Sequence, residues 1–157
     1  MLKKVVEGLK LDYEIKSYSS IYKVLNPADH FSELRKISGE LVFDGYSMAV
    51  LITADQSPEA LLESIHLLYS KTVESLPQKG LSINLLVYEE QVSDRPGLTL
   101  PHPELHNRPE ELVPAAEVWP DYVHPILKKP LSELSRPHLS KPWGKFYLSA
   151  DSLLSQP

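Results

Sequence analysis

The spacing of apolar residues predicts helices and strands in the first part of the chain. Over 2–9 the apolar side chains recur at helical spacing, which predicts a short amphipathic helix. The run 13–24 alternates and is rich in Tyr, Ile and Ser, which predicts a strand. The Asn26-Pro27 pair that follows is a helix-start signal, so we expect a short helix over 28–36.

Residues 40–55 contain two β-type runs on either side of Asp44-Gly45. An Asp-Gly pair between such runs is typical of a tight hairpin, so we expect two strands with a turn at this pair.

A longer helix is predicted to begin after Ser57. Ser57 is a typical N-cap, and Pro58 suits the first helical position. Pro77 and Gly80 end this helix, and the strongly apolar run 81–90 then predicts a central strand. The stripe that we expect the helix to bury consists of Leu61, Leu62, Ile65, Leu68, Tyr69 and Val73.

The last third of the chain is rich in proline. The chain contains 14 prolines, most of them from Pro96 onward, so extended segments and turns are expected there. Helical turns are predicted within 109–120 and 129–136, and a short strand at "KFYL". We expect one domain over 1–157, of which 126–157 is a Pro-rich C-terminal extension. The element order predicts an α+β sandwich, a mostly antiparallel sheet with its long helices on one face.

Composition excludes several classes of function. The formal net charge is −5, and no block of Lys and Arg suggests a nucleic-acid partner or an anionic membrane surface. Cys is absent, which excludes disulfides and thiolate metal sites. No apolar run approaches the roughly 20 residues of a membrane span. We therefore expect a soluble cytoplasmic protein without a membrane partner.

Four segments together resemble one enzyme family. They are "SPEALL" before a helix, the apolar run ending "LLVYEEQV", the segment "LTLPHPELHNR" (98–108), and "LVPAAEVWPDYVHP". From about Tyr18 to Pro125 the chain resembles 6-hydroxymethyl-7,8-dihydropterin pyrophosphokinases, which transfer pyrophosphate from ATP to a pterin alcohol in folate synthesis. The resemblance implies a ferredoxin-like α+β sandwich, with ATP and Mg²⁺ as cofactors if the family activity is retained.

Some functional positions of the family match. The resemblance places His102 and Arg108 beside the ATP phosphates, as the candidate catalytic residues. A guanidinium can bind two phosphate oxygens at once, which suits phosphoryl-type transfer. The remaining candidate cofactor-binding residues implied by the resemblance are Thr99, Lys79, Tyr46 and Asn107.

Other functional positions differ. The resemblance places Ser82 and Asn84 where the family carries two Asp residues that bind Mg²⁺. Neutral side chains hold Mg²⁺ poorly, so we expect no metal site. Met48 stands in place of an asparagine that reads the pterin, and Glu110 in place of a stacking aromatic.

The resemblance also implies that a family strand is missing. The family has a strand and a Gly-Ser-Asn turn before its first helix, whereas this chain begins at that helix. An absent internal strand leaves backbone groups without partners. We expect either residues 39–43 or a partner chain, such as a second copy, to complete the sheet.

Two interpretations of the 98–108 segment stay open. His102 and Arg108 either contact an anion or remain in a loop whose shape Pro101 and Pro103 set, and the lost carboxylates favour the second. A metal pair of His102 and His106 would need a helix, which Pro103 disfavours.

Three functions follow. The favoured one is a divergent homologue that lacks normal Mg-ATP-dependent transfer and acts as a binding or interaction module. The alternatives are an active or weakly active pyrophosphokinase, and a protein that binds another anionic small molecule. A pterin or a nucleotide is the ligand that the resemblance implies.

Overall fold

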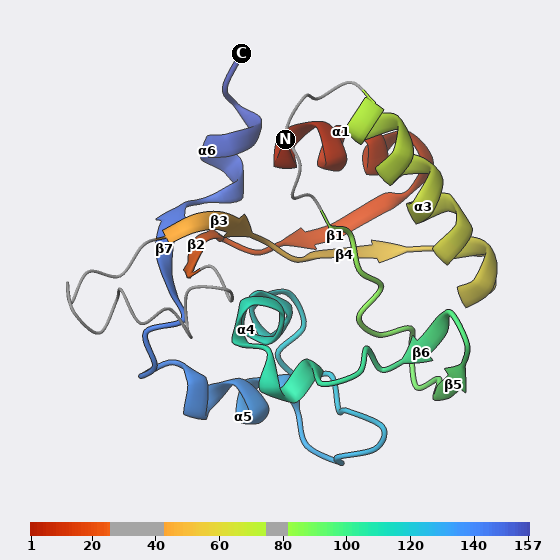
Figure 1. Cartoon of the computed structure of the whole chain (residues 1–157), viewed down its shortest axis with the longest axis vertical. Coiled ribbons are helices and arrows are strands. Elements are labelled where there is room, and N and C mark those ends of the chain that lie inside the picture. The colour runs from red at the N-terminus through yellow and green to blue at the C-terminus, as the bar shows by residue number, and fades with distance from the viewer. Residues whose placement is uncertain (26–42, 75–81) are drawn as a thin grey trace, which may run out of the picture.

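The computed structural model describes residues 1–25, 43–74 and 82–157. These residues form helices and antiparallel strand pairs (Figure 1), which confirms the α+β class. The elements are α1 (Leu2–Asp12), β1 (Glu14–Tyr18), β2 (Ile21–Leu25), β3 (Phe43–Ser47), β4 (Val50–Thr53), α3 (Pro58–Glu74), β5 (Ser93–Arg95), β6 (Leu98–Leu100), η2 (Leu105–Asn107), α4 (Pro109–Val118), α5 (Leu131–Ser135), η3 (Arg136–His138), β7 (Gly144–Leu148) and α6 (Ala150–Leu154).

A two-stranded sheet and a three-stranded sheet form a central band that is interrupted once. β1 pairs with β4, and β2 pairs with β3 on one side and β7 on the other, all antiparallel. Between the two parts, the backbone of Ser19 donates to the Ala49 carbonyl at 3.0 Å and its Oγ accepts from the Ala49 amide at 2.8 Å. The predicted strand 13–24 is therefore present, with a break at Ser19-Ser20.

The helices cover both sides of this band (Figure 1). α1 and α3 lie together on one side, and α4 lies on the other. α1 buries Val5, Val6 and Leu9, as its spacing predicts. α3 begins as predicted, because the Ser57 Oγ accepts from the Ala60 amide at 3.2 Å. Of its predicted stripe, Leu61 and Ile65 are buried, whereas Tyr69 is exposed.

The core lies around α4. A cluster of buried side chains joins this helix to η2, α5 and the connecting loop; it consists of Leu105, Leu112, Ala115, Ala116, Tyr122 and Leu131. Leu86 and Val87 pack against it from the segment after α3. The helical turns predicted within 109–120 and 129–136 are confirmed as α4 and α5, and the predicted "KFYL" strand as β7.

The prediction of a hairpin turn at Asp44-Gly45 was wrong. Both residues lie inside β3, where Gly45 pairs with Val24 of β2. Long-range pairing with β2 overrides the local turn preference of this dipeptide. The chain instead changes partner at Met48-Ala49, between β3 and β4.

The prediction of a strand over 81–90 was also wrong for the residues that the structure describes. Residues 82–88 belong to no strand, and none of their backbone N–H groups donates to another described backbone group. An apolar run forms a strand only beside a hydrogen-bonding partner, and here burial of Leu86 and Val87 comes from packing alone. The helix expected over 28–36 lies outside the described residues. Of the replacement strand expected over 39–43, only Phe43 is described, and it begins β3.

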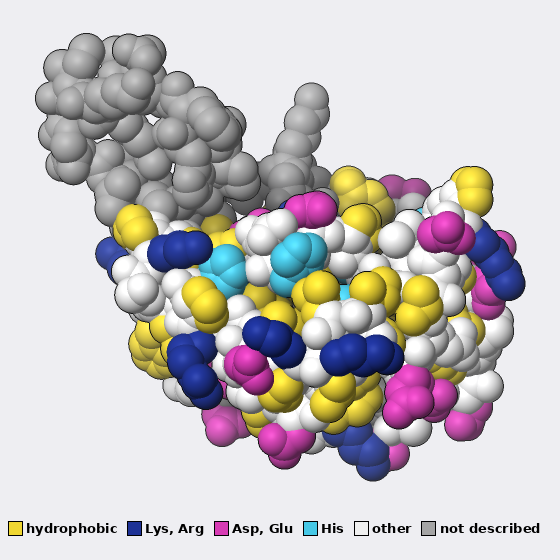
Figure 2. Space-filling view, turned by 90° about the horizontal axis from the view of Figure 1, so that it is seen from below, with side chains coloured by type: hydrophobic (Ala, Val, Ile, Leu, Met, Phe, Trp, Pro, Cys, Tyr) yellow, Lys and Arg dark blue, Asp and Glu magenta, His cyan; other side chains and the backbone are white. Residues whose placement is uncertain are grey.

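The sequence analysis missed the hairpin of β5 and β6. Ser93 pairs with Leu100 and Arg95 with Leu98, and Gly97 at the turn has φ +82°, a value that glycine adopts without strain. No helix of the described residues is long and apolar enough to span a membrane. On the face shown in Figure 2, basic, acidic and apolar side chains are interspersed.

Glu117 of α4 ties this helix to the break in the band. Its Oε1 accepts from the Ser20 amide at 2.8 Å and from the Ser20 Oγ at 2.7 Å, and its Oε2 accepts from the Tyr22 hydroxyl at 2.8 Å. Burial, followed by the hydrogen bond and the negative charge of Glu117, raises the pKa of Tyr22 to about 12.

Replacing Glu117→Gln should lower the pKa of Tyr22 without returning it to the ordinary value, because burial remains. The free energy of unfolding should fall by about 1 kcal/mol. An ultraviolet titration of tyrosinate, compared with Tyr22→Phe to assign the signal, measures the pKa. The matched control is Glu133→Gln, which removes only an exposed ion pair with Lys129. An unchanged Tyr22 titration would contradict the contact.

His124 closes the turn after α4. It is buried, and its Nδ1 accepts from the amides of Ile126 at 3.3 Å and Leu127 at 3.1 Å. Burial, and then the nearby His106, lowers the pKa of His124. Protonation would remove the lone pair that both amides need.

The free energy of unfolding should therefore fall as the pH drops below about 6.5, because the unfolded chain then binds a proton that the folded chain does not. His124→Asn keeps an acceptor and removes the titration, so its stability should depend less on pH. Denaturant unfolding between pH 5 and 8 measures this difference, with the exposed His66→Asn as control. Equal pH dependence in His124→Asn and the unmodified chain would refute it.

Candidate functional site

The 98–108 segment is held in place by its apolar residues. Leu98, Leu100 and Leu105 are buried, and the Leu100–Pro101 peptide bond is cis. The His138 Nε2 donates to the His106 carbonyl at 2.8 Å. The segment then enters α4 at Pro109, which suits the first turn of a helix. The polar residues between these anchors therefore stand in defined positions.

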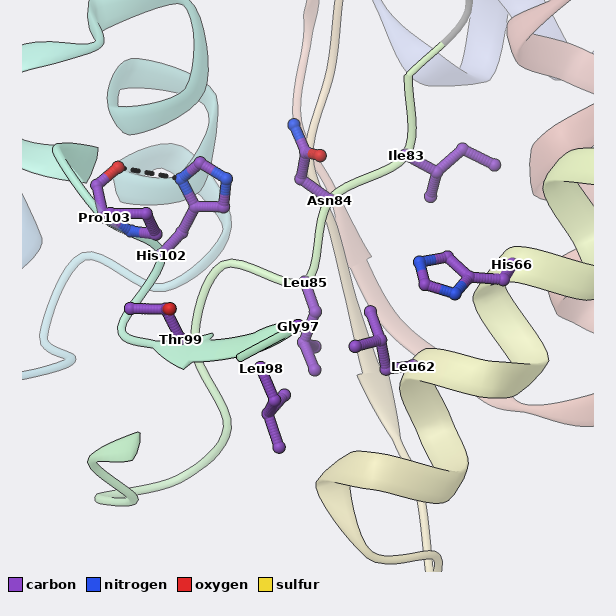
Figure 3. Close-up of a pocket in the computed structure, with 10 residues that line it drawn as sticks. All are labelled: Leu62, His66, Ile83, Asn84, Leu85, Gly97, Leu98, Thr99, His102 and Pro103. Carbon is purple, nitrogen blue, oxygen red and sulfur yellow. Dashed lines mark hydrogen bonds between the residues drawn. The ribbon is translucent and has the colours of Figure 1, made fainter. Parts of the chain in front are cut away.

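His102 lies beside the irregular segment 82–88. Its amide donates to the Leu86 carbonyl at 2.6 Å. Its Nδ1 donates to the Pro103 carbonyl at 3.0 Å, as Figure 3 shows, which leaves Nε2 as the acceptor in the neutral ring. The ring is thus oriented by its own loop.

Arg108 is paired with carboxylates of the helix that it precedes. Its Nε lies 3.2 Å from the Glu110 Oε1, and its Nη2 lies 3.4 Å from the Glu111 Oε1. The Glu111 side chain is only 12% exposed, against 41% for Arg108. The guanidinium therefore already has two anionic partners inside the protein.

Glu111 also contacts the position where the resemblance implies a metal ligand. The Asn84 Nδ2 donates to the Glu111 Oε1 at 2.6 Å. The Glu111 Oε2 lies 3.5 Å from the His102 Nδ1 and has no hydrogen-bond partner. We call Asn84, His102, Arg108, Glu110 and Glu111 the carboxylate cluster.

A small pocket lies on one side of this cluster. Its volume is about 260 Å³, and Figure 3 shows His66 and Leu62 of α3 facing His102 and Thr99 across it. Among the predicted site residues, the structure brings Thr99 and His102 together here, with Asn84 beside them. The pocket is smaller than most sites for drug-sized ligands.

A larger cavity, which we call the slot, lies between β4 and residues 82–89. Its volume is about 950 Å³. Arg108 and Tyr46 line the slot rather than the pocket, as do Met48 and Ser82. The structure thus divides the predicted site residues between two cavities that share Asn84.

The remaining predicted site residues lie apart from the pocket. Asn107 is exposed and donates to the Glu104 Oε2 at 2.7 Å. Tyr46 is half exposed and packs against Tyr147, with ring centroids 5.0 Å apart. The Lys23 ammonium lies 5.8 Å from the Tyr46 ring centroid. Lys79 lies outside the described residues.

The described residues contain no group of three or more His, Cys, Asp or Glu that could hold a metal ion. Ser82 is exposed, and Asn84 directs its amide nitrogen at Glu111. A donor N–H₂ group facing a carboxylate is hydrogen-bonded rather than free to approach a cation.

Comparison with known proteins finds two that are similar in sequence to part of this chain. The chain is 32% identical over 89 residues to the 2-amino-4-hydroxy-6-hydroxymethyldihydropteridine pyrophosphokinase of Synechocystis sp., covering 54% of this chain and 46% of that protein. It is 35% identical over 65 residues to the protein of the same name from Aquifex aeolicus, 41% of each chain. The chain is a divergent relative of the pterin pyrophosphokinases. It spans less than half the length of either relative, and no protein-family model matches it.

The sequence analysis missed Glu111 as a functional neighbour of Arg108. Glu110 and Glu111 are a usual pair for the first turn of a helix, where carboxylates suit the helix dipole. The signal that could have found the contact is their spacing, two and three residues after Arg108, since side chains three residues apart meet on a helix.

The double variant Glu110→Gln, Glu111→Gln should bind inorganic pyrophosphate at least about tenfold more tightly than the unmodified chain, because two negative charges no longer compete for Arg108. Adding Arg108→Ala should remove the gain. Titration calorimetry at low salt measures both affinities. Glu59→Gln and Glu133→Gln together serve as a control of equal charge change outside the cluster. A gain of the same size in the control would show that net charge alone acts.

Proposed function

We propose that this relative of the pterin pyrophosphokinases does not carry out normal Mg-ATP-dependent pyrophosphoryl transfer and acts as a binding or interaction module. The observation that carries the proposal is the carboxylate cluster, in which Arg108 is paired with Glu110 and Glu111.

The charge of the cluster opposes a phosphate ligand. Arg108 supplies one positive charge, and two carboxylates lie within 3.4 Å of its nitrogens. Unless His102 is protonated, the cluster therefore has a net charge of about −1. A polyphosphate would have to displace both carboxylates and leave the mostly buried Glu111 without its cation, which costs several kcal/mol.

The two positions where the resemblance implies metal ligands support the same proposal. Ser82 and Asn84 carry no charge, and in the family resemblance they replace two carboxylates. Catalysis of phosphoryl-type transfer consists mainly of positioning and charge neutralisation. The two replaced carboxylates no longer provide metal ligands, and Arg108 is already paired with Glu110 and Glu111. Both positioning and charge neutralisation are therefore weakened.

The pterin side offers support as well. Glu110 occupies the position of a stacking aromatic in the resemblance, and its carboxylate faces Arg108. Met48 has no amide with which to read a pterin edge. Neither side chain has an aromatic face to stack on a pterin ring, and the Glu110 carboxylate is already paired with Arg108.

A direct assay tests the proposal. Incubated with Mg-ATP and 6-hydroxymethyl-7,8-dihydropterin, the chain should release no AMP above background. The Synechocystis relative, assayed in parallel, is the positive control. Calorimetry should detect neither Mg-ATP nor the pterin at micromolar affinity. Turnover that Arg108→Ala abolishes would overturn the proposal and favour a weakly active pyrophosphokinase instead. Tight binding of Mg-ATP without turnover would favour an anion-binding role.

A further inference from the structure

The loop between α4 and α5 turns two aliphatic side chains toward solvent. The His124 amide donates to the Lys129 carbonyl at 2.9 Å, which closes the loop at its base. Ile126 and Leu127 at its tip are exposed, Ile126 by 58% of its surface, and neither lines the pocket or the slot. We call residues 124–130 the tip loop.

The tip loop bonds its own backbone donors. The buried His124 accepts at Nδ1 from the amides of Ile126 at 3.3 Å and Leu127 at 3.1 Å. The Lys128 amide donates to the His124 carbonyl at 2.8 Å, and Pro125 has no amide. These donors keep their hydrogen bonds when the tip leaves water, which is the condition that a lipid environment imposes on a backbone.

Cationic side chains surround the tip loop. Residues 121–141 contain four Lys and Arg and two acidic residues, in a chain of net charge −5. Lys129 pairs with Glu133 of α5 at 3.2 Å, whereas the exposed Lys128 and Arg136 have no ion pair among the described residues. α5 and the tip loop lie at one end of the molecule (Figure 1), and Figure 2 shows Lys and Arg beside apolar side chains across the middle of that end.

The types of side chain favour a bilayer over a protein partner. Protein interfaces are enriched in aromatic residues and Arg and depleted in Lys, whereas the tip loop offers two aliphatic side chains and two Lys. Such side chains suit the boundary between acyl chains and anionic headgroups, where each cation strengthens binding about fivefold. Long Lys stems let the ammonium groups stay at the headgroups while the apolar tip enters.

We propose that the tip loop docks on a bilayer surface rich in anionic lipid, with Ile126 and Leu127 entering the headgroup boundary and Lys128, Lys129 and Arg136 facing the lipid phosphates. This goes beyond the proposed function, because neither cavity and no residue of the carboxylate cluster takes part. It departs from the expectation of no membrane partner, which rested on the absence of a contiguous basic block in the sequence.

Sedimentation of the full chain with sucrose-loaded vesicles tests the proposal. At low salt, vesicles of equal parts phosphatidylserine and phosphatidylcholine should bind it at least about tenfold more tightly than phosphatidylcholine alone, and added salt should weaken this binding. The double variant Ile126→Ser, Leu127→Ser should weaken it at least about tenfold, since two apolar side chains no longer leave water. Leu67→Ser, an equally exposed position on α3, is the matched control and should change nothing.

Two further variants test the charge and the site of contact. Glu133→Gln removes the partner of Lys129 and should tighten binding to the mixed vesicles about fivefold, whereas Glu63→Gln on α3 should not. Because the chain has no Cys, Ile126→Cys can carry a single environment-sensitive fluorophore. Its emission should shift to the blue on the mixed vesicles, and the same label at Leu67→Cys should not respond.

The proposal is overturned if the chain does not bind the mixed vesicles at low salt, or if the serine double variant binds them equally well. A label at position 126 that responds to soluble polyglutamate and not to vesicles would assign the surface to an acidic polypeptide and overturn it as well. Neither result depends on the pyrophosphokinase assay, so this proposal and the proposed function can fail separately.

Discussion

The carboxylate of Glu111 connects three parts of the molecule that are distant in sequence. It accepts a hydrogen bond from Asn84 after α3, pairs with Arg108 at the start of α4 and lies near His102 of the intervening loop. Because Glu111 is mostly buried, its charge requires these partners. The interaction thus holds the irregular segment 82–88 against α4 and determines which charges face both cavities.

The same carboxylate cluster closes one end of the slot. With β4 open on one side and 82–88 unpaired on the other, the band of strands is incomplete among the described residues. The packing of Leu86 and Val87 and the contacts of Glu111 and Tyr88 hold the second segment without a ladder. The proposed loss of phosphate chemistry and the open edge of β4 therefore involve the same carboxylate cluster.

Local rules predicted most of the helices and strands. The spacing of Val5, Val6 and Leu9 and the Ser57 cap were sufficient for α1 and α3, because helix formation depends on neighbours along the chain. The predictions of a turn at Asp44-Gly45 and of a strand over 81–90 were wrong, because strand pairing depends on partners far away in sequence. The resemblance located His102 and Arg108, but the pairing of Arg108 with Glu110 and Glu111 emerged only from the fold.

A double-mutant cycle between Arg108 and Glu111 tests most directly whether internal carboxylates hold the cation of this site. The free energies of unfolding of the unmodified chain, Arg108→Met, Glu111→Gln and the double variant give the coupling. The account predicts a favourable coupling of about 1 kcal/mol or more, since residues in one charged network are not additive. Additivity within about 0.3 kcal/mol would contradict it, because Arg108 would then be available to an external anion.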